Sequence, residues 1–235
     1  MPRVRLWSCF GLAALISFAG CGSAEPEGEG PAGPISQAEL IKSIKPTAHQ
    51  PKAVPFPKVR IKTSQGDIVI KLHAEKAPRT VENFLAYVDS GHYNGTIFHH
   101  VRSGDIVMGG GYGSDLKEKA KESLAAPVRN EAREAGALTN VRGTIAMARE
   151  LNVIDSSRCQ FFFNLADNDY LDPAKSENAP YPPNPTEYGF CAFGEVVEGM
   201  DVLDRIGSQE VSDKGAPFDM LPKRTVLIQS IYRMK

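Results

Sequence analysis

Alternating apolar and polar residues from residue 58 onward constrain the fold of this chain more than any other feature. Residues 59–63 and 68–72 alternate on either side of a turn at 64–67, which is the pattern of a β-hairpin. Further strands are expected at 96–101, 143–148, 160–165, 190–197 and 225–232. Many short strands with few helices favour a mainly β fold with a closed or nearly closed antiparallel architecture.

Two helices are expected beside these strands. Pro78 suits the first turn of one helix, an apolar stripe with helical spacing follows it, and Gly91 ends it. The second helix is expected at about 199–206. Because no internal repeat appears after residue 57, one folded domain is predicted at 58–235.

Composition and motif spacing exclude several classes of function. Lys and Arg total 27 against 28 for Asp and Glu, so the chain lacks the basic excess of a nucleic-acid binder. No run approaches the roughly 20 apolar residues of a membrane-spanning helix. The glycine run at 109–113 lacks the Lys and Ser or Thr of a phosphate-binding loop. His99 and His100 point to opposite faces of a strand and cannot easily share one ion, so we expect no metal site.

The first residues are typical of a secretory signal peptide. Arg3 and Arg5 precede an apolar run at 10–20, and small residues lead to Cys21. Residues 16–21 resemble the lipobox of bacterial lipoproteins, in which the cysteine is lipidated and becomes the mature N-terminus. We therefore expect a signal peptide at 1–20, a lipid on Cys21 and a flexible linker at 21–57. The domain would then be membrane-anchored at the periplasmic or extracytoplasmic face of the cell envelope, with plain secretion as the alternative.

Five motifs follow one another along the folded region. They lie at 98–101, 108–111, 142–148, 160–162 and 193–201. This series resembles the cyclophilin-type peptidyl-prolyl cis-trans isomerases, and segments 130–132 and 165–168 are similar to the bacterial periplasmic branch. The resemblance implies an eight-stranded antiparallel barrel capped by two α-helices.

The resemblance also implies the reaction. Cyclophilins rotate the peptide bond before proline, whose barrier is about 20 kcal/mol. Because no bond breaks, neither a nucleophile nor a cofactor is needed. In the family, a groove on the outside of the barrel seats the proline ring, and an Arg donates a hydrogen bond at the proline nitrogen of the twisted amide. The implied partners are proline-containing peptides or unfolded envelope proteins, bound by a monomer.

One side of this groove keeps the family's residues. Gln160 and Phe162 match the groove Gln and the proline-pocket Phe, and they share one strand face while Phe161 and Phe163 point into the core. The other substrate-binding residues implied on this side are Met147, Ala148, Tyr170, Leu171 and Phe190. Tyr170 stands where many cyclophilins carry Trp, so strong cyclosporin binding is not expected.

The opposite side departs from the family. Phe98 is retained as a substrate-binding residue, but His100 stands at the position of the catalytic Arg. Asp105, Ile106 and Met108 replace the pocket Phe, Met and Gln. The loss of a donor aimed at a transition state costs about 2.7–4 kcal/mol, or about 100- to 1,000-fold in rate.

Two further expectations concern this altered side. An unpaired carboxylate in an apolar pocket is costly, so the pocket is expected to be open at Asp105. Arg102 lies two residues beyond His100 and would point to the same face on a continuing strand, where it could act as a substitute donor. The candidate catalytic residues are therefore His100, Gln160 and Phe162.

Three functions remain open from the sequence. The first is a folding-assisting prolyl isomerase of the envelope with reduced activity, the second an inactive module that binds proline-containing peptides, and the third a scaffold that does not use the groove. The Pro-rich segment 172–188 is interpreted as a surface insertion, with a partner-binding loop as the alternative. Cys159 and Cys191 flank the groove, and a disulfide between them is an open possibility.

Overall fold

A computed structural model describes residues 56–119, 126–174 and 184–235 of the chain. The predicted signal peptide, Cys21 and nearly all of the 21–57 linker lie outside the described residues, as does the middle of the 172–188 segment. Within the described part, no helix is long and apolar enough to cross a membrane.

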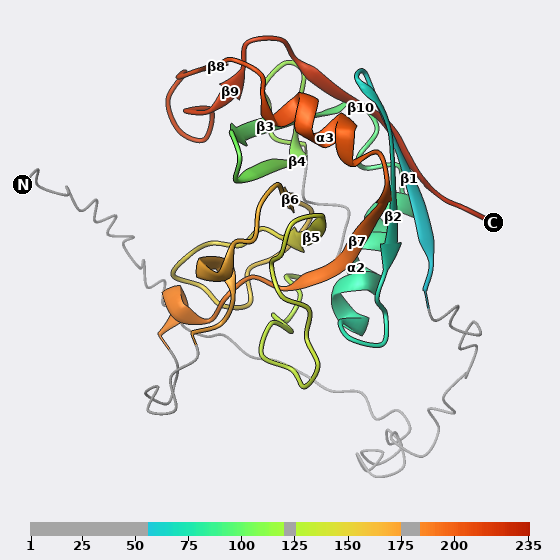
Figure 1. The fold of residues 1–235 in the computed structure, drawn as a ribbon, viewed down its shortest axis with the longest axis vertical. Helices are drawn as coiled ribbons and strands as arrows, with labels where there is room; N and C mark the ends of the chain where they lie inside the picture. The colour runs from blue at the N-terminus through green and yellow to red at the C-terminus, as the bar shows by residue number, and fades with distance from the viewer. Residues whose placement is uncertain (1–55, 120–125, 175–183) are drawn as a thin grey trace, which may run out of the picture. The chain divides into compact units, whose positions relative to one another are not determined.

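Eight strands close into an antiparallel barrel (Figure 1). Their bounds are β1 Lys58–Thr63, β2 Gly66–Leu72, β3 Thr96–Arg102, β4 Ile106–Gly113, β5 Thr144–Met147, β6 Phe161–Asn164, β7 Ala192–Glu198 and β10 Val226–Arg233. The order around the barrel is β1-β10-β3-β4-β6-β5-β7-β2. The predicted fold class is confirmed, and closure leaves no unpaired sheet edge in the barrel.

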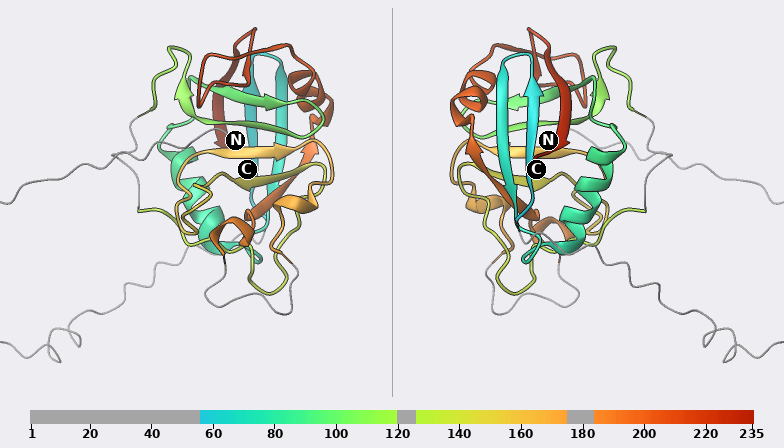
Figure 2. Two further views of the ribbon diagram at one scale, coloured as in Figure 1. Left: turned by 90° about the vertical axis from the view of Figure 1, so that its left-hand side faces the viewer. Right: turned by 90° about the vertical axis from the view of Figure 1, so that its right-hand side faces the viewer.

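Two helices lie at opposite ends of the barrel (Figure 2). They are α2, Pro78–Asp89, and α3, Met200–Gly207. Short elements lie in the loops: the 3-10 helices η1, Asp169–Leu171, and η2, Pro185–Glu187, and the hairpin of β8, Val211–Ser212, with β9, Leu221–Pro222.

Aromatic side chains fill the barrel interior. Phe161 and Phe163 are fully buried there, with ring centroids 5.8 Å apart, as the strand alternation predicts. Phe84 of α2 packs against Phe161 at 5.7 Å and against Phe193 of β7 at 5.1 Å. Since full burial of such a side chain is worth about 1.5–3 kcal/mol, this cluster anchors α2 to the barrel.

A distant carboxylate caps α2. The helix has no side-chain cap of its own, and Pro78 occupies its first turn. Glu131 supplies the missing acceptor: its carboxylate accepts hydrogen bonds from the backbone N–H groups of Arg79 and Thr80 and from the Thr80 hydroxyl at 2.7 Å. A buried negative charge at the positive end of a helix both satisfies these donors and complements the helix dipole.

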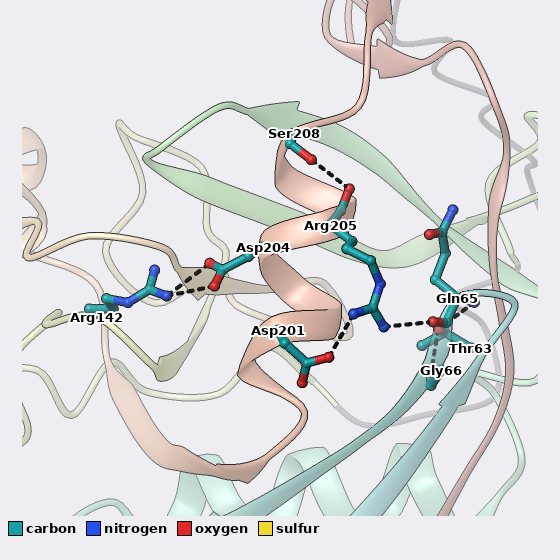
Figure 3. A network of polar contacts seen from close by, with 8 residues as sticks. All are labelled: Thr63, Gln65, Gly66, Arg142, Asp201, Asp204, Arg205 and Ser208. Atoms are coloured by element: carbon teal, nitrogen blue, oxygen red, sulfur yellow. Dashed lines mark hydrogen bonds and ion pairs between the residues drawn. The ribbon is translucent and has the colours of Figure 1, made fainter.

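Arginines hold α3 against its neighbours (Figure 3). Arg142 contacts both carboxylate oxygens of Asp204 at 2.9 and 2.8 Å. Arg205 donates to Asp201 one turn earlier at 2.6 Å and to the backbone carbonyl of Gln65 in the β1–β2 turn at 3.2 Å. These contacts fix the helix at this end of the barrel.

Strand β4 is missing from the sequence-based strand list, because its glycine run reads as a loop. In the structure, glycine is required by close packing instead. A Cβ on Gly109 would lie 2.8 Å from the Phe98 ring, and one on Gly111 would lie 2.6 Å from the Gln160 side chain. The absence of a side chain at Gly111 thus leaves room for the Gln160 side chain to pack against β4.

Candidate functional site: an apolar groove outside the barrel

A second apolar cluster, here called the groove cluster, is separate from the barrel interior. It comprises Ile106, Met108, Leu138, Ala146, Ala148, Phe162, Leu171, Phe190 and Ala192. On β4, β5 and β6 its members alternate with Val107, Ile145 and Phe163, which belong to the interior. The groove cluster therefore lies on the outer face of these strands.

A β-bulge directs His100 to this outer face. Phe98 pairs with Gly109 while His100 pairs with Met108, so two steps along β3 match one step along β4. Bulges of this kind re-aim side chains, often beside active sites. Phe98 stays in the interior, whereas His100 comes to lie opposite Met108, a residue of the groove cluster.

His100 begins a row of side chains across four strands. It pairs with Met108, Met108 pairs with Phe162, and Phe162 pairs with Ala146. Phe162 is buried beneath the groove surface, and the ring of Phe190 meets it edge-on with centroids 5.6 Å apart. A polar ring thus lies at one end of a preformed apolar surface.

A polar cluster lies beside the groove cluster at the β3–β4 turn. The Tyr170 hydroxyl on η1 donates to Asp105 Oδ1 at 2.6 Å, and Arg102 Nη2 lies 2.9 Å from Asp105 Oδ2. Arg102 pairs with Ile106 across the β3–β4 turn, which places it on the groove face. Partial burial of the hydroxyl and its hydrogen bond to Asp105 raise the pKa of Tyr170 to about 12.

A pocket of about 220 Å³ adjoins the groove cluster at Met108 and Ala148. Its lining combines two groove-cluster residues with polar side chains: Met108, Ala148, Arg149, Glu150, Ser156, Arg158, Cys159 and Gln160. Gln160 is thereby brought beside Met108, two strands from His100 in the barrel order.

Comparisons with known proteins agree with this geometry. Residues 58–232 match the family model described as cyclophilin type peptidyl-prolyl cis-trans isomerase/CLD. The chain belongs to the cyclophilin family. It is 41% identical over 195 residues to peptidyl-prolyl cis-trans isomerase A of Dickeya dadantii, covering 82% of this chain and 94% of that protein. It is 42% identical over 173 residues to peptidyl-prolyl cis-trans isomerase B of Escherichia coli, covering 74% and 97%.

One similar solved structure was determined in the presence of a proline-containing dipeptide. The cyclophilin-type isomerase of Cryptosporidium parvum, crystallised in the presence of Ala-Pro, is 26% identical, with a TM-score of 0.59 over 76% of this chain and 99% of that one. Family membership makes this chain a cyclophilin-type peptidyl-prolyl cis-trans isomerase, and the predicted resemblance is confirmed.

Most of the residues expected in the cyclophilin groove are brought together. Ile106, Met108, Ala148, Phe162, Leu171 and Phe190 belong to the groove cluster, and His100, Gln160 and Tyr170 lie at its edges. Two of the expected residues lie outside the groove. Phe98 and Met147 are in the barrel interior, each with at most 1% of its surface exposed. Because residues alternate along β5, Ala146 and Ala148 face the groove in place of Met147.

The expectation of an open pocket at Asp105 is wrong. Only 16% of the Asp105 side chain is exposed. Its carboxylate is nevertheless not isolated, because Arg102 and Tyr170 both contact it. Arg102 does lie on the expected face, since β3 continues through it, but its guanidinium is held by Asp105.

Two residues that the sequence reasoning missed shape the cyclophilin groove. Asp219, in the β8–β9 hairpin, places Oδ1 3.4 Å from His100 Nδ1. Arg149 stacks on the Phe190 ring at 4.8 Å and donates to the carbonyls of Gly189 at 3.0 Å and Pro185 at 2.7 Å. Both residues act across long sequence separations, which leave no local pattern.

The two cysteines of the described domain are thiols. Cys159 and Cys191 are both buried and are not joined in a disulfide. Burial raises the pKa of the Cys191 thiol to about 11, which keeps it protonated and unreactive at neutral pH.

Proposed function

We propose that this cyclophilin assists protein folding at the cell envelope, anchored by a lipid on Cys21, with an isomerisation rate reduced by the replacement of the family's Arg. Its substrates are proline-containing segments of unfolded envelope proteins, bound by a monomer. The observation that carries the proposal is the row of His100, Met108 and Phe162 along the groove. This row keeps the apolar surface on which proline is expected to bind, but it carries His100 where the family has Arg.

Each retained residue has a role in this reaction. We assign Phe162 to the floor of the apolar groove that holds the proline ring, with Ile106 and Leu171 beside it. Fixing the ring leaves the preceding carbonyl free to rotate, and a donor at the proline nitrogen favours the twisted amide over the planar one. We assign binding of the substrate backbone to Gln160, because it lines the pocket beside Met108.

The reduced rate follows from His100. An imidazole is shorter than a guanidinium and presents fewer N–H donors. Arg102 lies two residues further along β3, and one nitrogen of its guanidinium contacts Asp105, so we do not assign it the role of the family's Arg. We therefore expect a rate roughly 100- to 1,000-fold below that of a cyclophilin with the Arg.

The test is exchange NMR on an unstructured Ala-Pro peptide with the full chain and its His100→Arg variant. The proposal predicts measurable acceleration by the unmutated chain and a faster rate in His100→Arg. No acceleration, with the peptide still shifting the resonances of Phe162 and Phe190, would replace it with a proline-binding module. No acceleration and no shifts would leave only a scaffold role.

The envelope location needs a separate test. The chain is expressed in a bacterium with Cys21 intact or as Cys21→Ser, and the membrane and soluble fractions are compared. We expect the intact chain in the membrane fraction with a lipid-modified N-terminal Cys21 by mass spectrometry, and release of Cys21→Ser. Equal fractionation of the two would contradict the lipid anchor.

A further inference from the structure

Asn140 is a buried polar residue in the loop that leads into β5, and only 1% of its surface is exposed. Its side-chain nitrogen donates to the carbonyls of Leu171 at 3.2 Å and Phe190 at 3.1 Å, and to Asp172 Oδ1 at 2.9 Å. Leu171 and Phe190 both belong to the groove cluster, although they stand at the two ends of the segment 172–189. One amide group therefore ties together two groove residues that are distant along the chain.

The same residue contacts both ends of η1. The backbone N–H of Asn168, which directly precedes η1, donates to the Asn140 carbonyl at 2.8 Å. At the other end, the Asn140 side chain reaches the carbonyl of Leu171, the last residue of η1. Because η1 carries Tyr170 and Leu171, this bracket fixes where both side chains stand beside the groove cluster.

A chain of buried asparagine side chains continues from Asn140 toward Asp105. Asn164 Nδ2 donates to Asn140 Oδ1 at 3.2 Å. Asn168 Nδ2 donates to Asn164 Oδ1 at 2.9 Å and to the Asp105 carbonyl at 3.1 Å. Asn164 and Asn168 are at most 4% exposed. Loss of one member of such a network leaves its partners unsatisfied, because water does not readily replace it in a buried site.

The contacts of Asn140 require an amide. Its nitrogen faces three oxygens and its oxygen faces the donor nitrogen of Asn164, so turning the amide over would oppose like groups. A carboxylate would place a negative charge against three acceptors. An apolar side chain would remove the donor from the carbonyls of Leu171 and Phe190.

We propose that Asn140 is a positioning residue for substrate binding, which brackets η1, joins it to Phe190 and thereby sets the spacing of the groove wall against which the peptide packs. This inference rests on the proposed function and deepens it, because it assigns substrate affinity to a buried residue outside the groove cluster. A wall that contacts the planar and the twisted amide equally contributes uniform binding. Its loosening therefore weakens affinity and leaves the rate of the bound peptide nearly unchanged.

The experiment measures two quantities for the Ala-Pro peptide with the full chain: Kd by NMR titration and the cis–trans exchange rate at saturation. Asn140→Ala removes the amide. Asp172→Asn is the matched control on the same network, because Asp172 Oδ1 accepts from the Asn140 backbone N–H at 2.7 Å and from its side chain at 2.9 Å. An amide oxygen can accept both hydrogen bonds, and the contacts of Asn140 with the groove residues remain.

Two more variants separate positioning from stability. Thr63→Val removes a buried hydroxyl that donates to the Gly66 carbonyl at 2.7 Å in the β1–β2 turn. Neither β1 nor β2 borders β4, β5 or β6 in the barrel order, so this variant reports a loss of stability away from the groove cluster. Asn168→Ala removes the side-chain contacts at the start of η1 and decides the question if Asn140→Ala does not fold.

We expect Kd to rise about 3- to 10-fold in Asn140→Ala, the equivalent of about one net hydrogen bond, and about 2- to 5-fold in Asn168→Ala. The exchange rate at saturation should change by less than about twofold in both. Asp172→Asn and Thr63→Val should leave Kd unchanged. Partial unfolding alone would lower the apparent rate but not alter the Kd of the folded molecules, so Kd is the readout of positioning.

The outcomes separate this inference from the proposed function. Unchanged Kd in Asn140→Ala and Asn168→Ala, in chains that still accelerate exchange, would overturn the positioning role and leave the isomerase function intact. An equal rise of Kd in Asp172→Asn or Thr63→Val would also overturn it, because the effect would not belong to the Asn140 amide. A rise of Kd confined to Asn140→Ala and Asn168→Ala, without acceleration by any chain, would support the positioning role and contradict the isomerase function.

Discussion

The hydroxyl of Tyr170 donates a 2.6 Å hydrogen bond to Asp105. The largely buried carboxylate of Asp105 therefore has a hydrogen-bond donor beside the apolar groove. Arg102 contacts the other carboxylate oxygen at 2.9 Å. The cluster explains how the chain accommodates Asp105 at a position where the resemblance implies an aromatic wall. It also places one nitrogen of the Arg102 guanidinium beside Asp105.

This cluster should be measurable as a coupling between Tyr170 and Asp105. We expect a double-mutant cycle of Tyr170→Phe and Asp105→Ala, measured by urea unfolding, to give about 0.5–1.5 kcal/mol of coupling, which is the usual net contribution of one hydrogen bond to stability. Tyr188→Phe combined with Asp105→Ala is the control pair and should be additive. Additivity for Tyr170 as well would show that the hydrogen bond contributes nothing to stability.

Arg149 should act on substrate affinity through Phe190. In Arg149→Lys, the stacked guanidinium and its hydrogen bonds to the carbonyls of Gly189 and Pro185 are lost, so the Phe190 ring is no longer held at the groove. We expect KM for the Ala-Pro peptide to rise about 2- to 10-fold with kcat nearly unchanged.

The matched control is Arg133→Lys, because Arg133 stacks on Tyr188 at 5.1 Å and donates to the Glu187 carbonyl in the same loop region. It should leave KM unchanged. A fall in kcat with constant KM in Arg149→Lys would instead place Arg149 in the chemical step.

Glu131 should stabilise the domain through the start of α2. Glu131→Gln keeps the shape of the side chain but removes the charge that faces the N–H groups of Arg79 and Thr80. We expect the free energy of unfolding to fall by about 1–2 kcal/mol. Glu134→Gln, a surface residue paired with Arg129 at 3.2 Å, should change it by less than about 0.5 kcal/mol. Equal effects would contradict the capping role.

His99 makes stability depend on pH. Burial, and then the neighbouring charge of His100, lower the pKa of His99 to about 4 from an ordinary value of 6.5. Above pH 6.5 the ring is neutral in both the folded and unfolded states. As the pH falls from 6.5 to 4, the unfolded chain takes up the proton first, and the folded state loses stability, by up to about 3 kcal/mol.

The check is urea unfolding of the unmutated chain and of His99→Gln across this pH window. Titrating carboxylates contribute equally to both, so the difference isolates His99. The unmutated chain should lose more stability than the variant between pH 6.5 and 4. Parallel curves would mean that His99 takes up its proton equally in both states.

The sequence predicted the elements whose signals are local. The β1–β2 hairpin, the Pro78 helix start and the alternation that buries Phe161 and Phe163 all follow from neighbouring residues, and the structure confirms them. Strand β4 was missed because its glycines are required by close packing against Phe98 of β3 and against Gln160, which directly precedes β6.

The sequence predicted most of the residues that line the groove, but not the orientation of each one or its contacts with distant loops. Motif matching found the groove residues but placed Phe98 and Met147 among them, because it did not apply the strand alternation at Met147 or foresee the bulge beyond Phe98. Asp219 and Arg149 carry no motif of their own. Their contacts with His100 and Phe190 arise only when the hairpin and loops fold over the barrel.

The most direct test of the central claim is the cis–trans exchange rate of an Ala-Pro peptide at catalytic amounts of the full chain, compared with the same chain carrying Phe162→Ala. If the groove seats proline for rotation, the unmutated chain accelerates exchange and Phe162→Ala returns it to the uncatalysed rate, with the fold intact by circular dichroism. Equal rates for the two proteins would contradict catalysis in this groove.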